Sequence, residues 1–125
     1  MNIFLDDTRS PRNVTWVDLP LVEWTIVRNY DDFVRIISSL GPPKRVSLDH
    51  DLHPAHYPFA PENQEAYKNG IPYDKYKEKT GYHCAKWLVA YCIDRGFPFP
   101  EYYVHSMNPI GRENIIKYIE SNIIS

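Results

Sequence analysis

The stretch NIFLDDTR, residues 2–9, decides the fold, because a short apolar run passes directly into two carboxylates, a hydroxyl and a guanidinium. A run of this kind is typical of a buried strand whose carboxyl end reaches the surface. Two further runs rich in β-branched and aromatic residues lie at 24–27 and 102–104, and a third, apolar run lies at 46–48. We therefore predict four short strands, the first at residues 2–5.

Three helical patterns separate and follow these strands. Apolar side chains recur at intervals of three and four residues within 33–40, 84–92 and 115–123. Gly41 and Gly96 are expected to end the first two helices, whereas Thr80 and Asn108 begin the last two. Strands that alternate with helices predict one doubly wound α/β domain over residues 1–125, with a mostly parallel sheet of about four strands.

Two stretches follow no regular period. Residues 8–22 contain two prolines, so we expect an irregular connection with about one helical turn. Residues 53–79 contain four prolines and four tyrosines, and we predict a long insertion loop after the third strand. The aromatic content favours a lid that packs over a ligand, and the alternative is a disordered insertion.

Composition excludes several classes of partner. The net charge is −2 and no basic block is present, which argues against binding to long nucleic acid. No run approaches the ~20 apolar residues of a membrane span, and the acidic start does not fit a secretion signal. The sequence therefore predicts a cytoplasmic globular protein with no membrane contact.

Polar residues collect directly after three of the four predicted strands. They are Asp6-Asp7-Thr8-Arg9, Asp49-His50-Asp51, and His105-Ser106 with Asn108. In an open parallel sheet, ligands bind beyond the carboxyl ends of the strands, so these residues predict one site. The second strand ends in Arg28-Asn29, which suits an edge strand remote from that site.

Four carboxylates would share this crevice, namely Asp6, Asp7, Asp49 and Asp51. Their mutual repulsion requires a cation or a proton, and aspartate oxygens suit Mg²⁺ or Mn²⁺. We assign the metal to Asp6, Asp7 and Asp49. Because Mg²⁺ is often shared with phosphate oxygens, we expect a phosphate ligand held by the Arg9 guanidinium and by amides near Thr80. Any one of these acids could instead cap a turn or lie in solvent, but their joint position favours a site.

Two histidines, His50 and His105, directly follow strands. His50 lies between Asp49 and Asp51, which favours its protonated form near neutral pH, so we assign it as a proton donor that Asp51 orients. His105 is the complementary base. The alternative for each histidine is a structural bond to a neighbouring carbonyl group.

The motifs LDDTRSP (5–11), SLDHDL (47–52), Thr80-Gly81, Trp87-Leu88 and VHSMNP (104–109), with Gly111 and Asn114, resemble the cyclic-phosphate processing receiver-like family. The resemblance covers nearly the whole chain and implies a receiver-derived (flavodoxin-like) fold, found often in bacteria and tailed phages, that acts on cyclic phosphates of nucleotides. It points to ten functional positions: Asp6, Asp7, Arg9, Asp49, His50, Asp51, Thr80, His105, Ser106 and Asn108. No fifth strand ending in lysine follows the last helix, which argues against phosphorylation signalling.

The leading hypothesis is a metal-dependent phosphoesterase that opens a cyclic phosphate of a nucleotide or an ADP-ribose derivative. The catalytic set is Asp49, His50, Asp51 and His105, the phosphate-binding set is Arg9, Thr80, Ser106 and Asn108, and Mg²⁺ or Mn²⁺ is the cofactor. Tyrosines of the insertion loop would stack on a base. The alternative is a module that binds or sequesters a nucleotide phosphate without turnover, or a receiver-like switch phosphorylated on Asp49.

Overall fold

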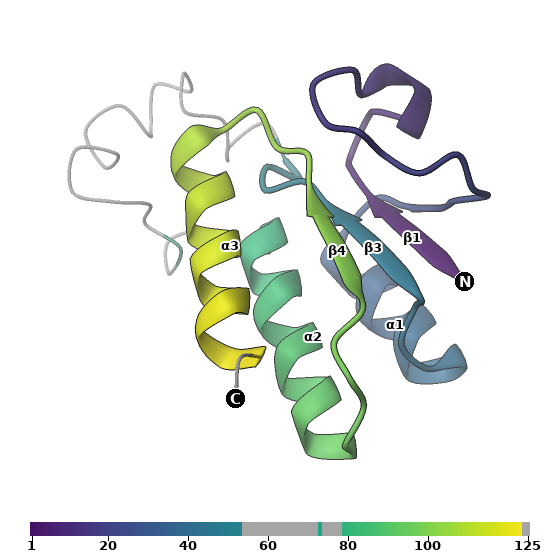
Figure 1. The fold of residues 1–125 in the computed structure, drawn as a ribbon, viewed down its shortest axis with the longest axis vertical. Coiled ribbons are helices and arrows are strands. Elements are labelled where there is room, and N and C mark those ends of the chain that lie inside the picture. The colour runs from purple at the N-terminus through teal and green to yellow at the C-terminus, as the bar shows by residue number, and fades with distance from the viewer. Residues whose placement is uncertain (54–72, 74–78, 124–125) are drawn as a thin grey trace.

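The computed structural model describes residues 1–53, 73 and 79–123 (Figure 1). Its elements are β1 (Asn2–Leu5), the 3₁₀ helix η1 (Pro11–Asn13), β2 (Thr25–Val27), α1 (Tyr30–Leu40), β3 (Arg45–Leu48), α2 (Gly81–Arg95), β4 (Glu101–Val104) and α3 (Pro109–Ile123). The four strands form one parallel sheet in the order β2-β1-β3-β4. This confirms the predicted receiver-like α/β fold, and the predicted elements differ from the observed ones mainly at their ends.

One face of the sheet packs against all three α-helices. Side chains alternate along each strand, so every second residue joins this core. The core buries Ile3, Leu5, Val27, Val46, Leu48 and Val104 from the sheet against Phe33, Ile37, Leu88, Cys92, Ile115 and Ile119 from the helices. Helix α2 contacts both α1 and α3, and Figure 1 shows α2 beside α3.

The opposite face of the sheet is covered by the connection between β1 and β2. Its prolines leave one 3₁₀ turn, η1, as the sequence predicted. The Trp24 ring meets the edge of Phe4 at a centroid distance of 6.4 Å, and Trp16 Nε1–H donates to the carbonyl oxygen of His105 at 2.7 Å. The chain therefore winds from β1 along one face and returns through helices on the other, as a doubly wound fold requires.

Helix ends follow the predicted caps. Gly41 and Gly96 follow α1 and α2 with φ of +88° and +73°, a region that glycine enters without a Cβ clash. Thr80 is the N-cap of α2, and the Asn108 side chain accepts a bond from the amide of Gly111 in the first turn of α3. These caps fix where each helix meets the sheet.

Strand register brings the predicted site together. Leu5 pairs with both Val27 and Leu48, and Leu48 pairs with Val104. The four strands therefore stop at one level, and the residues that follow them lie along one edge of the sheet.

The predicted lid at residues 53–79 lies outside the described residues, apart from His53, Tyr73 and Lys79. Within the described part of the chain, no helix combines the length and the apolar character that a membrane crossing requires.

Candidate metal and phosphate site

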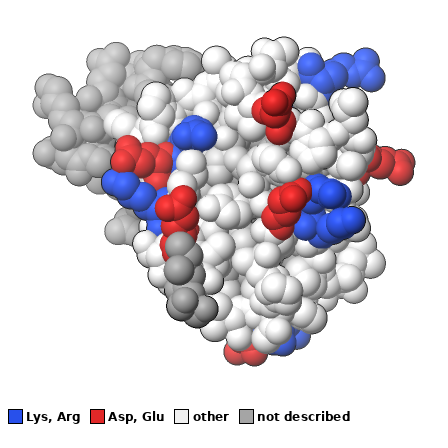
Figure 2. All heavy atoms as spheres, viewed as in Figure 1, with Lys and Arg blue, Asp and Glu red and all other residues white. Residues whose placement is uncertain are grey.

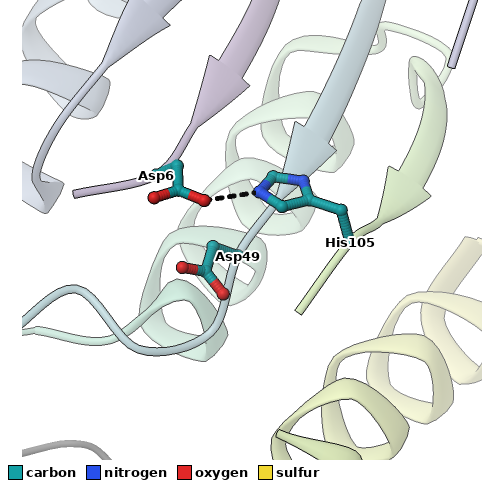
Figure 3. A group of neighbouring side chains, drawn as sticks. All are labelled: Asp6, Asp49 and His105. Carbon is teal, nitrogen blue, oxygen red and sulfur yellow. Dashed lines mark hydrogen bonds and ion pairs between the residues drawn. The ribbon is translucent and has the colours of Figure 1, made fainter. Parts of the chain in front are cut away.

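Asp6, Asp49 and His105 follow β1, β3 and β4, and each offers one ligand atom within 4.8 Å of the other two (Figure 3). Their side chains are almost completely buried, with Asp49 the most exposed at 4%. Two acids and one imidazole are thus gathered at the sheet edge, where the sequence predicted a site.

Asp6 is the ionised member of the group. Its Oδ1 accepts backbone bonds from Thr8 at 2.9 Å and Arg9 at 2.8 Å, and its Oδ2 lies 3.1 Å from His105 Nε2 and 3.5 Å from Arg9 Nη1. Burial alone would raise the pKa of Asp6, but the bonds from His105, Arg9 and Thr8 outweigh it and lower that pKa to about 2. Asp6 is therefore a carboxylate at neutral pH.

Asp49 is the protonated member when no cation is present. Burial raises the pKa of Asp49 to about 8, and repulsion by Asp6 adds to the effect, although Asp49 Oδ1 accepts the backbone N–H of His50 at 2.8 Å. The pKa values of two acids that share a buried site move apart in this way, because ionising both of them there costs free energy. The separation of the two pKa values indicates that the site has too few positive charges for its two carboxyl groups.

The His105 ring contacts Asp6, Ser47 and Phe4. Burial lowers its pKa, so the ring is neutral at neutral pH and carries one proton. Because ionised Asp6 only accepts hydrogen bonds, we assign that proton to Nε2, and Nδ1 then accepts from Ser47 Oγ at 2.7 Å. The ring also stacks on Phe4 with centroids 4.4 Å apart. His105 is fixed in both orientation and tautomer.

The donor set fits a divalent cation. Carboxylate oxygens are common ligands of divalent ions, and a cation would remove the repulsion that keeps Asp49 protonated. His105 Nε2 would join them only in the other tautomer, in which Nδ1 carries the proton and donates to Ser47 Oγ. Asp6 and Asp49 are two of the three predicted metal ligands. Asp7 is half-buried and does not belong to this group, in which His105 takes the third place.

His50 belongs to a second cluster. Its ring is fully buried, Nδ1 lies 2.7 Å from Asp51 Oδ1, and Nε2 lies 2.8 Å from the hydroxyl of Tyr73. Asn108 Nδ2 also donates to Asp51 Oδ1, at 3.1 Å. The structure therefore brings His50 and Asp51 together, but the other ring nitrogen of His50, Nε2, is bonded to Tyr73 and does not point towards the acidic group.

The four predicted phosphate-binding residues differ in access. Arg9 keeps 30% of its side chain exposed, and its guanidinium lies 5.2 Å from the centre of the Trp16 ring. Thr80 is fully buried and bonds to His83 Nδ1 at 2.9 Å. Ser106 Oγ accepts from the Asn108 amide at 3.1 Å, and both residues are buried. Arg9 is the member of this set best placed to meet a ligand.

Arg28 was expected to lie remote from the site, and that prediction is wrong. Its Nη1 donates to the carbonyl oxygens of Asp6 at 3.1 Å and Arg9 at 2.7 Å. Although β2 is an edge strand, its long basic side chain spans the turn at residues 6–9. Arg28 thus holds the loop that carries Asp6 and Arg9, and its position directly after a strand was the available signal.

Two glycines allow close packing at the ends of β3 and β4. A Cβ built at Gly81 would overlap the carbonyl oxygen of Asp49, and one built at Gly111 would overlap the His50 ring. The Gly81 amide also donates to the carbonyl oxygen of His50 at 2.7 Å. The starts of α2 and α3 therefore press directly against the two clusters.

The comparisons with known proteins agree with the motifs. A family model described as "Cyclic-phosphate processing Receiver domain" matches residues 1–121, which include all four strands and every residue of the site. None of the curated proteins and none of the solved structures gives a significant match. The chain therefore belongs to the cyclic-phosphate processing receiver domain family.

Proposed function

We propose that the protein is a metal-dependent phosphoesterase that opens a cyclic phosphate of a nucleotide or an ADP-ribose derivative. The observation that carries the proposal is the approach of Asp6, Asp49 and His105 within 4.8 Å at the end of the sheet. Membership of a family associated with cyclic-phosphate processing supports the substrate class.

Mg²⁺ or Mn²⁺ would be held by Asp6 and Asp49, with His105 beside them. When bound, a divalent cation neutralises phosphoryl oxygens in the transition state. The Arg9 guanidinium would neutralise the same phosphoryl oxygens, because it is partly exposed and already lies against Asp6. The hydrolysis adds a water oxygen to phosphorus, breaks one ring P–O bond and leaves a monoester with a free hydroxyl group.

The two histidines contribute differently to this proposal. The proton of His105 sits on Nε2, which faces Asp6, so His105 holds a proton inside the acidic group. His50 Nε2 faces the Tyr73 hydroxyl, so it reaches a ligand only through that residue. Asp51 fixes the orientation of the His50 ring through its contact with Nδ1.

A small molecule is favoured over a macromolecular anion as partner. Among the described residues on the face drawn in Figure 2, basic and acidic side chains are interspersed, and no continuous basic stripe crosses that face. Nucleic-acid backbones need such a stripe, because each bound phosphate is neutralised by a basic side chain.

A non-catalytic binding module is the second candidate, and the burial of the histidines favours it. His50 and His105 have no exposed surface, and both nitrogens of each ring already have partners. Neither ring therefore has a nitrogen directed at an open position where a ligand could give or take a proton. A protein of this kind would retain a cyclic phosphate unchanged.

Turnover separates the two candidates. The purified chain is incubated with a panel of cyclic nucleotides and Mn²⁺ or Mg²⁺, and the products are identified by mass spectrometry. We expect a monoester product with the parent and with Asp94→Asn, an exposed control. Asp49→Asn should give none. His105→Ala should lose on the order of 10²- to 10⁴-fold in turnover, whereas Arg9→Ala should weaken binding as well as rate. Recovery of intact, tightly bound ligand with the parent would favour the binding module.

A further inference from the structure

Three side chains meet at the surface beside the acidic group. The guanidinium carbon of Arg9 lies 5.2 Å from the centre of the Trp16 ring, and Arg9 Nη2 lies 3.5 Å from Met107 Sδ. Trp16 is 40% exposed, Met107 is 63% exposed, and the Arg9 side chain keeps 30% of its surface. We call Trp16, Arg9 and Met107 the Trp16 patch. The patch is open to solvent and lies wholly within the described residues.

The Trp16 patch is attached to the candidate metal site at two points. Arg9 Nη1 lies 3.5 Å from Asp6 Oδ2, so the guanidinium borders the acidic group. Trp16 Nε1–H donates to the carbonyl oxygen of His105 at 2.7 Å, which fixes the indole at the end of β4. The connections that follow β1 and β4 leave the same end of the sheet (Figure 1). A ligand group that extends from the acidic group past Arg9 therefore meets Trp16 or Met107.

Packing alone does not account for this arrangement. Single exposed apolar side chains are common and need no explanation. Here two large apolar side chains contact the same cation, and that cation contacts a buried carboxylate of the acidic group. The structural alternative is that Trp16 only screens the pair of Arg9 and Asp6 from water.

Arg9 keeps donors for a phosphate. A guanidinium carries five N–H groups, and among the described residues its side-chain contacts are Asp6 Oδ2, Met107 Sδ and the Trp16 ring. Sulfur is a weak acceptor, so a phosphate oxygen readily replaces it as the partner of Nη2. A phosphate held by Arg9 leaves the exposed surfaces of Trp16 and Met107 to the group that the phosphate carries.

An aromatic base is the group that suits these surfaces. Nucleic-acid bases stack on aromatic side chains and on Arg guanidinium planes, because each presents a π face. The polarisable thioether of methionine also makes favourable contacts with aromatic rings. A second phosphate, by contrast, needs cations or N–H donors, whereas the indole N–H of Trp16 is already bonded to the chain and Met107 offers only a thioether.

We propose that Trp16 and Met107 bind the aromatic base of a nucleotide whose cyclic phosphate lies against Arg9 and the acidic group. The base and the cyclic phosphate then belong to one ribose, since Trp16 directly contacts the side chain that holds the phosphate. An ADP-ribose derivative with its cyclic phosphate on the terminal ribose is disfavoured, because its adenine lies beyond a pyrophosphate. This inference rests on the proposed function for the position of the phosphate, and it makes Trp16 a specificity-determining residue.

Two cyclic phosphates that differ in whether the ribose carries a base test the proposal. They are adenosine 2′,3′-cyclic monophosphate and ribose 2,3-cyclic phosphate, each supplied with Mn²⁺. The readout is the preference for the first compound, taken from kcat/KM where the compounds are hydrolysed and from dissociation constants where they are bound unchanged. Stacking on an aromatic side chain strengthens binding roughly 5- to 100-fold per base, so we expect the parent to prefer the nucleotide at least about 5-fold.

Variants of the Trp16 patch identify the source of this preference. Trp16→Leu should lower it by about 5-fold or more, and Met107→Ala by about twofold or more. Trp16→Phe keeps an aromatic ring and should retain most of it. Ile110→Ala is the matched control, because Ile110 is 42% exposed at the start of α3 and lies outside the patch. If Trp16→Leu does not fold, Met107→Ala, at the more exposed position, decides the matter.

The outcomes distinguish this inference from the proposed function. Equal hydrolysis of both compounds by the parent, or an unchanged preference in the folded variants, overturns the base site and leaves the phosphoesterase intact. An equal loss of both compounds in Trp16→Leu also overturns it, because Trp16 then acts only through Arg9 or His105. Preferential binding without hydrolysis supports the base site and rejects the phosphoesterase. Binding of neither compound by the parent overturns both.

Discussion

The two histidine clusters use the same residue types and differ in how their charges are matched. In the first, two acids face one neutral imidazole, and the pKa values of Asp6 and Asp49 separate to about 2 and about 8. In the second, the Asp51 carboxylate has His50 and Asn108 as donors, and His50 has Tyr73 at its other end.

The difference indicates which cluster lacks a partner. A buried group of acids that must keep a proton at neutral pH has too few positive charges around it, so it can be completed by a cation. A cluster in which each donor has its acceptor is complete as a protein network, and it serves to hold a side chain in place. We therefore assign ion binding to the first cluster and positioning to the second.

The largest effect should come from Gly81→Ala, which breaks the first cluster through the backbone. The new methyl group would overlap the carbonyl oxygen of Asp49, and no side-chain rotation can relieve that clash. We expect a loss of more than about 4 kcal/mol in the free energy of unfolding. Urea unfolding against Ser121→Ala, an exposed control on α3, measures it. A loss within about 0.5 kcal/mol, as at ordinary surface positions, would contradict the packing.

A smaller loss is expected for Gly111→Ala, which acts on the second cluster. The clash here is with the His50 side chain, which can shift at the expense of its bonds to Asp51 and Tyr73. Overpacking of this kind costs about 1–3 kcal/mol. The same unfolding measurement checks the value. Because a divalent cation binds only the folded state, we also expect Mn²⁺ to raise the melting temperature of the parent, and that rise should survive in Gly111→Ala. Loss of that rise would mean that the two clusters are not separate.

The change in the free energy of unfolding over one pH unit should be the smallest of these effects. The pKa of Asp49 is about 8 in the folded protein against an ordinary value of 3.8, so between these limits the folded state holds one more proton than the unfolded state. The free energy of unfolding without metal should therefore fall as pH rises from about 4 to about 8, by up to about 1.4 kcal/mol per pH unit. Asp6 acts oppositely: its stabilisation is present above about pH 4 and is lost as pH falls towards about 2.

Asp49→Asn is the control for this pH dependence, because the amide cannot ionise. Urea unfolding in chelator across the window should show a flatter profile for the variant. Equal slopes for parent and variant would assign the dependence to another group.

The strands and caps were predictable because their signals are local. Apolar runs mark β1 and β3, and glycines with positive φ end α1 and α2. The site itself followed from topology, since residues after parallel strands must meet at one edge. The cytoplasmic location and the lid stay predictions.

Partners that come from distant parts of the chain could not be found in this way. Ser47 bonds to His105 across the sheet, Arg28 reaches back to Asp6, and Tyr73 meets His50 from the far side of the insertion. Ser47 gave a faint signal as a hydroxyl inside an apolar run. Tyr73 gave none, because nothing in its neighbours distinguishes it from the other tyrosines of residues 53–79. Only the folded register decides which polar groups face one another.

The most direct test of the account is calorimetric titration of the purified chain with Mn²⁺ in buffers of different ionisation enthalpy and at several pH values. Because a cation must displace the proton of Asp49, about one proton should be released per ion near neutral pH, and the affinity should rise about tenfold per pH unit up to about 8. Asp49→Asn should abolish binding, and Asp94→Asn should leave it unchanged. Absence of binding by the parent, or binding without proton release that Asp49→Asn retains, would contradict the assignment of the acidic cluster to a divalent cation.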